Sequence, residues 1–109
     1  MDLLELLQRA RSRIADPHNW TQQALARTGV ATPCNPTAKA ARSWCLMGSL
    51  MWASGGESRL IWEAVKELTA EIETEERDLD VGQFNDQHGH ARILDLLDQT
   101  IARIQATDL

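Results

Sequence analysis

The chain has 109 residues, of which 43% are hydrophobic and 25% are charged, and its formal net charge is −5. This length and composition fit one globular domain and exclude a disordered or fibrous protein. Its longest apolar stretch, 46–53, is far shorter than the roughly 20 residues that cross a bilayer. Two cysteines match neither a disulfide framework nor a zinc pattern. We therefore expect a single helical domain over 1–109, in the reducing cytoplasm, with no cofactor and no membrane partner.

Three stretches have the apolar spacing of amphipathic helices. In residues 3–14 the apolar side chains recur at i, i+3/4 and i+7. Asp2 can accept hydrogen bonds from the first amides, and Asp16-Pro17 ends the helix. Comparable stripes predict a helix over about 57–76 and another over about 89–107. We interpret residues 80–89 as a loop between these two helices.

The segment 17–34 has no clear periodicity. Trp20 and the apolar residues 24–26 are compatible with a short helix or an irregular loop, or with the first arm of a hairpin that turns at Thr28-Gly29. We favour the short helix or irregular loop.

Residues 36–54 predict a central helix. Asn35 and Pro36 supply a cap and a first-turn proline, and the following residues are apolar on nearly every side. Gly48 lowers helix propensity, which indicates that another backbone passes close by; a second copy of the chain, in a homodimer, is one candidate. The predicted fold is all-α, a compact four-helix bundle-like single domain with an irregular segment between its first two long helices.

Negative charge is concentrated in the second half of the chain. Residues 1–56 carry six Lys and Arg against three Asp and Glu, whereas residues 57–109 carry five against thirteen. Like charges recur every four residues along one stripe of the predicted third helix: Glu63, Glu67, Glu71 and Glu75. This stripe is either a solvated helix face or a docking surface for a basic protein partner. Direct binding to nucleic acid is disfavoured, because basic residues are few and scattered.

Trp62 stands next to this glutamate stripe. It lies beside the apolar stripe of its helix, so it fits either the edge of the core or a half-exposed anchor for a partner. A tryptophan more often belongs to the core edge, which we favour, and we keep Trp62 as a candidate contact residue.

A few side chains could carry chemistry. Asp86, His88, His90 and Cys45 offer zinc ligands, and Cys45 with a histidine could form a nucleophile and base. The spacing argues against both, because residues i and i+2 of a helix point about 200° apart. A thiol inside an apolar helix is also held protonated and inert. We therefore expect no metal site and no catalytic residue.

Two short segments resemble a known group of sequences. Trp44-Cys45-Leu46-Met47-Gly48, and Phe84-Asn85-Asp86 followed by the apolar helix from His90, resemble a family of small uncharacterised proteins of bacteria and their phages. That family carries a W-C-x-x-G segment, an N-D pair and a closing helix. The start of the chain, up to Trp20, is also similar. The resemblance implies a helical fold and a mobile-element origin, and no known activity, cofactor or catalytic residue.

Together these features favour a non-catalytic protein-interaction module that contacts a basic partner through Trp62 and the glutamate stripe. By analogy with small acidic phage proteins, we expect a phage- or prophage-derived inhibitor of a nucleic-acid-handling host defence enzyme, such as a CRISPR effector. The alternative is a small enzyme or metal-dependent domain that uses Asp86, His88, His90 and Cys45.

Overall fold

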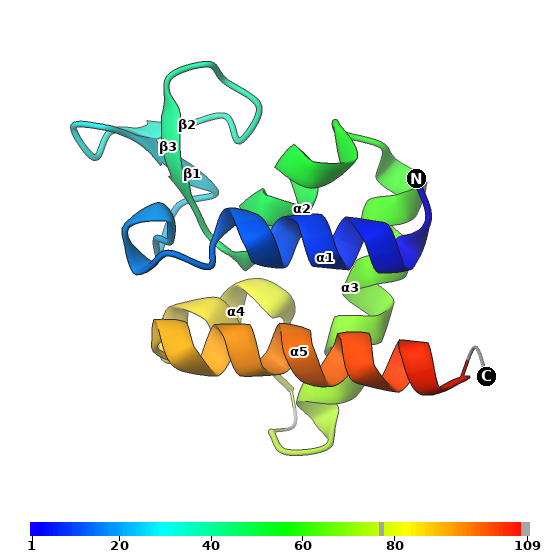
Figure 1. The fold of residues 1–109 in the computed structure, drawn as a ribbon. Coiled ribbons are helices and arrows are strands. Elements are labelled where there is room, and N and C mark those ends of the chain that lie inside the picture. Colours follow the sequence, from blue (N-terminus) through cyan, green and yellow to red (C-terminus); the bar gives the residue numbers. More distant parts are fainter. Residues whose placement is uncertain (77, 108–109) are drawn as a thin grey trace.

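A computed structural model describes residues 1–76 and 78–107 (Figure 1). Its helices are α1 (Leu3–Arg13), α2 (Leu46–Ser54), α3 (Ser58–Glu73), α4 (Val81–Gln87) and α5 (His90–Thr107), with a short 3-10 helix, η1 (Pro17–Asn19). Its strands are β1 (Ala26–Thr28), β2 (Pro33–Cys34) and β3 (Ala41–Trp44), which form an antiparallel sheet in the order β2-β1-β3. The fold is therefore mixed α/β, and the prediction of an all-α four-helix bundle was wrong.

The helices α1, α3 and α5 lie where the hydrophobic spacing predicts them. The Asp2 carboxylate accepts a hydrogen bond from the Glu5 amide at 2.8 Å and so caps α1, as expected. α1 packs against α2, α3 and α5, and α3 packs against α5. The buried apolar residues of these three helices are Leu6, Leu7, Ala10, Leu60, Ala64, Leu68, Ile72, Ile93, Leu96 and Leu97. None of the described helices is long and apolar enough to cross a membrane.

Residues 17–45 form a lobe around the sheet, at one end of the helical part (Figure 1). The central strand β1 places Ala26 opposite Cys34 on one side and opposite Trp44 on the other. The hairpin between β1 and β2 closes with a hydrogen bond from the Thr28 amide to the Thr32 carbonyl at 2.8 Å. The hairpin alternative is thus confirmed for residues 26–34, where the favoured short helix or irregular loop is wrong. The favoured prediction holds for η1 and for residues 20–25, which are irregular.

Residues 36–45 do not form the first half of the predicted central helix. The Asn35 side chain does accept a hydrogen bond from the Thr37 amide at 2.9 Å, and the Ala38 amide donates to the Asn35 carbonyl at 3.0 Å. These bonds close a single turn, after which the chain enters β3. Asn35 therefore does cap the backbone that follows it, but it begins a turn and not a helix. Asn side chains accept hydrogen bonds from backbone amides equally well in turns.

The strand β3 is held by its pairing and by a buried tryptophan. Ala41 and Trp44 are buried while Arg42 between them is exposed. The Trp44 indole N–H donates to the Pro36 carbonyl at 2.8 Å and so satisfies the only polar group of the ring. Pairing with β1 outweighs the local helix propensity of this alanine-rich stretch, and only residues 46–54 of the predicted helix are helical.

The predicted loop 80–89 contains the helix α4. Asp80 and Gln83 form a capping box, because the Asp80 carboxylate accepts from the Gln83 amide at 2.8 Å and the Gln83 side chain accepts from the Asp80 amide at 3.0 Å. Phe84 is fully buried against the core. The loop prediction was wrong because a helix of seven residues is too short to show an apolar period.

Gly48 lies where another backbone crosses α2, as its sequence position indicates. A Cβ atom at Gly48 would lie 1.8 Å from the Leu25 carbonyl oxygen. The same carbonyl accepts a hydrogen bond from the Cys45 amide at 3.1 Å, so the approach is fixed by a bond. The backbone that crosses α2 at Gly48 is the molecule's own segment before β1. This segment occupies the space at the glycine that a second copy of the chain would need in a homodimer.

We predict that Gly48→Ala lowers the free energy of unfolding by at least about 2 kcal/mol, because the added methyl must displace a hydrogen-bonded backbone carbonyl. Urea denaturation followed by circular dichroism measures this change. The matched control is Gly89→Ala, where a Cβ atom would have no neighbour within 4 Å. We expect this control to stay within about 0.5 kcal/mol of the wild type. Equal stability of the two variants would contradict the close approach.

Candidate functional site

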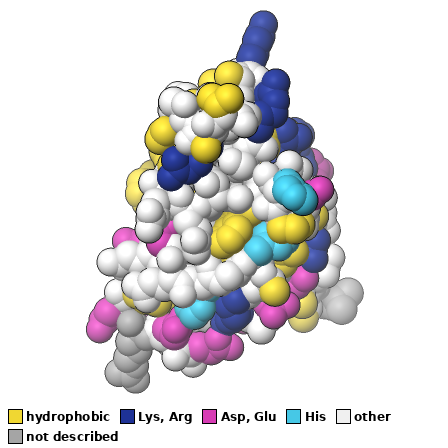
Figure 2. All heavy atoms as spheres, turned by 90° about the vertical axis from the view of Figure 1, so that its left-hand side faces the viewer, with side chains coloured by type: hydrophobic (Ala, Val, Ile, Leu, Met, Phe, Trp, Pro, Cys, Tyr) yellow, Lys and Arg dark blue, Asp and Glu magenta, His cyan; other side chains and the backbone are white. Residues whose placement is uncertain are grey.

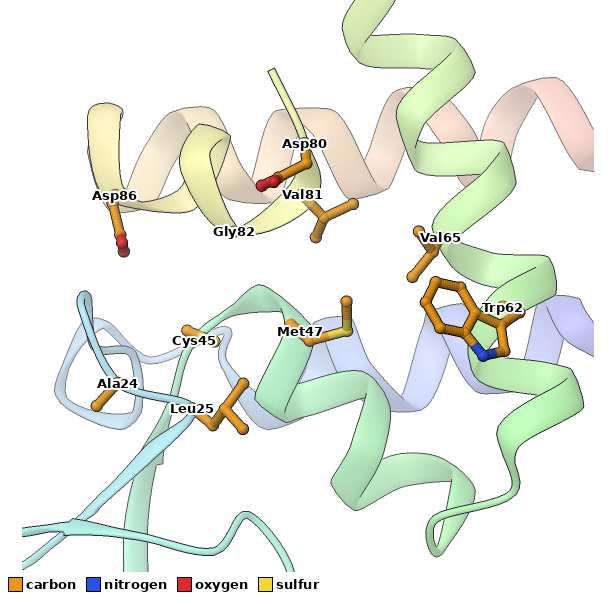
Figure 3. A pocket seen from close by; sticks show the side chains of 10 residues that line it. All are labelled: Ala24, Leu25, Cys45, Met47, Trp62, Val65, Asp80, Val81, Gly82 and Asp86. Atoms are coloured by element: carbon orange, nitrogen blue, oxygen red, sulfur yellow. The ribbon is translucent and has the colours of Figure 1, made fainter. Parts of the chain in front are cut away.

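An apolar groove lies between α2, α3, α4 and the segment before β1 (Figure 3). Its volume is about 490 Å³, and a shallower hollow of about 300 Å³ continues from it and shares Leu25, Met47 and Trp62. We call the two together the Trp62 groove. Its lining residues are Ala24, Leu25, Cys45, Met47, Met51, Ser58, Ile61, Trp62, Val65, Asp80, Val81, Gly82 and Asp86. Most of this lining is apolar, and Figure 3 shows Met47 and Val81 on facing elements across the groove.

Trp62 is the exposed wall of this groove. Trp62 is 67% exposed, although Leu60, two residues earlier on the same helix, is buried in the core. The interpretation of Trp62 as a residue of the core edge is therefore wrong. Its position matches the less favoured alternative, a partly exposed aromatic residue beside the apolar stripe of its helix. Leu25 on the opposite side of the groove is 42% exposed. Two large apolar side chains thus face solvent next to one hollow.

The groove is held together by one buried amide, that of Asn85. Its Oδ1 atom accepts hydrogen bonds from the Trp20 indole N–H at 2.8 Å and from the Leu46 amide at 3.0 Å. Its Nδ2 atom donates to the Thr21 carbonyl at 3.1 Å. One side chain therefore joins α4, the start of α2 and the chain that leads into the sheet. Asn85 has no exposed surface. Without its side chain, each of these three groups would lose its hydrogen-bond partner.

Two neighbouring side chains extend this link. The Gln22 amide group donates to the carbonyls of Asn85 at 3.1 Å and His88 at 2.9 Å, at the end of α4. The Asp86 carboxylate accepts from the Gln23 amide at 2.8 Å, and Gln23 has a positive φ of 63°. These bonds fix the segment that carries Leu25 against α4, so the groove has rigid walls.

Cys45 is a buried residue of the groove lining. It occupies the N-cap position of α2 instead of the helix interior, and its Sγ atom accepts from the Gly48 amide at 3.2 Å. Burial raises the pKa of the Cys45 thiol; hydrogen bonds from the Gly48 and Met47 amides partly offset this, and the negative charge of Asp86 adds to it. A thiol of raised pKa is a poor nucleophile at neutral pH.

The candidate zinc ligands do not come together. Cys45 and Asp86 line the same groove, but the His88 ring contacts the Glu76 carboxylate at 2.7 Å, and the His90 ring contacts the Ile14 carbonyl at 2.6 Å. Within 1–76 and 78–107, no group of three or more His, Cys, Asp or Glu side chains is placed to hold a metal ion. The arrangement supports neither the zinc site nor the nucleophile and base that we considered.

The glutamate stripe is largely neutralised within the molecule, with Glu75 just beyond the end of α3. Arg103 of α5 pairs with both Glu67 at 2.8 Å and Glu71 at 2.9 Å, which raises the pKa of Arg103. Glu75 pairs with Arg92, also of α5. Glu63 lies 3.9 Å from the exposed guanidinium of Arg59. Glu67 and Glu71 thus connect α3 to α5, and Glu75 connects the turn after α3 to α5. Glu63 next to Trp62 is the stripe residue with the weakest internal partner.

Charge is divided between the two ends of the molecule. Residues 17–56, which include the sheet and α2, contain no Asp or Glu. On the face shown in Figure 2, Lys and Arg side chains gather at the end formed by the sheet, and most Asp and Glu side chains lie toward the opposite end. Asp86 of α4 and the N-cap residue of that helix, Asp80, line the groove.

The chain belongs to DUF6197, a family of unknown function whose model matches residues 1–103. No curated protein and no solved structure matches it. The segments Trp44–Gly48 and Asn85-Asp86, which suggested an uncharacterised family, meet at the Trp62 groove. Cys45 and Asp86 line it, Gly48 admits the Leu25 carbonyl, and Asn85 holds its walls together.

We predict that Cys45 reacts with iodoacetamide far more slowly than Cys34 at pH 7, because burial shields its thiol and keeps it protonated. Since the pKa of Cys45 is raised, its rate should continue to increase as the pH rises into the alkaline range. Mass spectrometry of the two cysteine peptides measures both rates. Comparable rates at pH 7 would show instead an accessible, activated thiol in the groove lining.

Proposed function

We propose that this member of a family of unknown function is a non-catalytic protein-interaction module that binds an apolar segment of a protein partner in the Trp62 groove. The observation that carries the proposal is the 67% exposed indole of Trp62 at the edge of a mostly apolar hollow. Large aromatic side chains dominate the energy of protein interfaces when they enter a pocket or form its wall. Met47 and Met51 add flexible apolar surface that adapts to a partner.

The charges around the groove favour a basic partner. Asp80 and Asp86 line the groove, and Glu63 neighbours Trp62. The carboxylates of Asp80 and Asp86 accept hydrogen bonds from backbone amides, but among the described residues no Lys or Arg lies within 4.0 Å of them. A partner segment with Lys or Arg next to its apolar residues would complement both features, and its binding would weaken as salt is added.

Trp62 and Glu63 remain contact residues under this proposal, whereas Glu67 and Glu71 also join α3 to α5, and Glu75 joins the turn after α3 to α5. Substituting lysine for Glu67 and Glu71 would place positive charge against Arg103, so the variant would weaken the fold and any binding together. A substitution at Trp62 avoids this difficulty, because the indole is mostly exposed.

We extend the proposal to the class of partner. A nucleic-acid-handling enzyme presents a basic surface by necessity, and the acidic half of this chain complements one. An inhibitor of phage or prophage origin that occludes a host defence enzyme, such as a CRISPR effector, would use this complementarity. This extension rests on the net charge of −5 and on analogy with small acidic phage proteins.

We predict that Trp62→Ala weakens partner binding at least about tenfold, a loss of about 1.4 kcal/mol, while the free energy of unfolding changes by less than about 0.5 kcal/mol. The partner is first isolated with the tagged wild-type chain from the native host. Isothermal titration of the purified partner then measures its Kd for the wild type and each variant.

The matched control is Val30→Ala, which removes an apolar side chain that is 85% exposed in the sheet lobe, outside the groove. We expect this variant to bind as the wild type does. Unchanged binding of Trp62→Ala, or an equal loss in both variants, would contradict a contact through the groove.

A further inference from the structure

A second hollow lies on α1 and shares no lining residue with the Trp62 groove. Its volume is about 340 Å³. It is lined by Glu5, Gln8, Arg9, Ser12 and Arg13 of α1, and by Trp52 of α2. We call it the arginine–tryptophan pocket. Its lining is more polar than that of the Trp62 groove, which points to a different kind of ligand.

Arg13 is held rigidly in this pocket by two indole rings. The centre of its guanidinium lies 4.0 Å from the centroid of the Trp44 ring and 4.7 Å from that of Trp52. The two rings lie 6.0 Å apart and are tilted by 51°, so they enclose the cation in a wedge. The Nε atom of Arg13 is buried and has no hydrogen-bond partner among the described residues. Cation–π contacts orient the group without satisfying its donors.

Arg9 supplies a second cation one helical turn earlier. Its guanidinium lies 5.7 Å from the Trp52 ring, and it is exposed. Neither Arg9 nor Arg13 has a carboxylate within 4.0 Å among the residues in 1–76 and 78–107. By contrast, Arg11 on the same helix pairs with Asp98 at 2.8 Å, and Arg103 pairs with two glutamates. The pocket therefore holds two guanidinium groups whose charge no carboxylate within 4.0 Å balances among the described residues.

We propose that the arginine–tryptophan pocket binds the phosphate group of a small molecule. Side chains one turn apart on a helix have Cβ atoms about 5–6 Å apart, so the long side chains of Arg9 and Arg13 can both reach one tetrahedral anion. A phosphate dianion accepts hydrogen bonds from two guanidinium groups at once and carries more charge than a carboxylate. Ser12 and Gln8 add neutral donors at the pocket wall. Because Arg13 is already oriented, binding costs little side-chain entropy.

Glu5 provides the sharpest test of this proposal. Its carboxylate lines the same pocket and would repel a bound anion. Substituting Glu5→Gln removes this repulsion and should tighten phosphate binding by about threefold. A purely structural role for Arg9 and Arg13 predicts no such gain. Because the variant gains affinity, its result cannot be attributed to unfolding.

The experiment titrates the full chain with inorganic phosphate at constant ionic strength, with chloride as the control anion, and follows the Trp52 indole N–H by two-dimensional NMR. We expect a saturable shift with phosphate and none with chloride. Arg9→Gln should weaken phosphate binding by about fivefold or more, because it removes one charge-assisted contact. Arg59→Gln, which changes an 80% exposed arginine of α3, should leave phosphate binding unchanged.

A parallel titration with adenosine monophosphate distinguishes the source of the phosphate. Tighter binding than inorganic phosphate would assign the pocket to a nucleotide-like ligand, whereas equal binding would assign it to the phosphate group itself. A shift that does not saturate below about 20 mM phosphate would overturn the proposal. Unchanged affinity in both Glu5→Gln and Arg9→Gln would overturn it as well.

Discussion

The side-chain amide of Asn85 is the interaction on which the rest of the structure depends. The sheet lobe is small, its strands are two to four residues long, and such strands are not stable by themselves. Asn85 attaches this lobe to the helices by accepting from the Trp20 indole and the Leu46 amide and donating to Thr21. A fully satisfied buried amide of this kind specifies one arrangement, because any other leaves several groups without partners. The same bonds set the distance between α4 and α2, and hence the shape of the Trp62 groove.

The sequence predicts those parts of the fold whose signals are local. The stripes of α1, α3 and α5 are long enough to show a period, and Gly48 indicates a close backbone because helices seldom contain an unexplained glycine. The strand β3 could not be predicted, because Ala41 and Trp44 adopt it only through pairing with residues 26–28, more than a dozen positions earlier. Asn35 shows the same limit, since its capping side chain fits a turn as well as a helix.

The candidate site was predictable to a similar extent. Trp62 stands out in the sequence because it lies off the apolar stripe, but only the fold shows the hollow beside it. The glutamate stripe is visible in the sequence, whereas its partners Arg92 and Arg103 are not, because the rotation of α5 against α3 is set by packing. Two surfaces of opposite chemistry result: an apolar groove lined by acids at one place, and a pair of arginines on indole rings at another.

The free energy of unfolding of Asn85→Ala tests the central claim most directly. Urea denaturation should show a loss of about 3 kcal/mol or more, because the buried Leu46 amide and the partly buried Trp20 indole are left without a partner. Hydrogen exchange at the amides of β1 and β3 should accelerate together with it. The exposed Asn35, changed to Ala, serves as the control and should cost no more than about 1 kcal/mol. A loss for Asn85→Ala no larger than that of the control, with unchanged exchange in the sheet, would contradict the account.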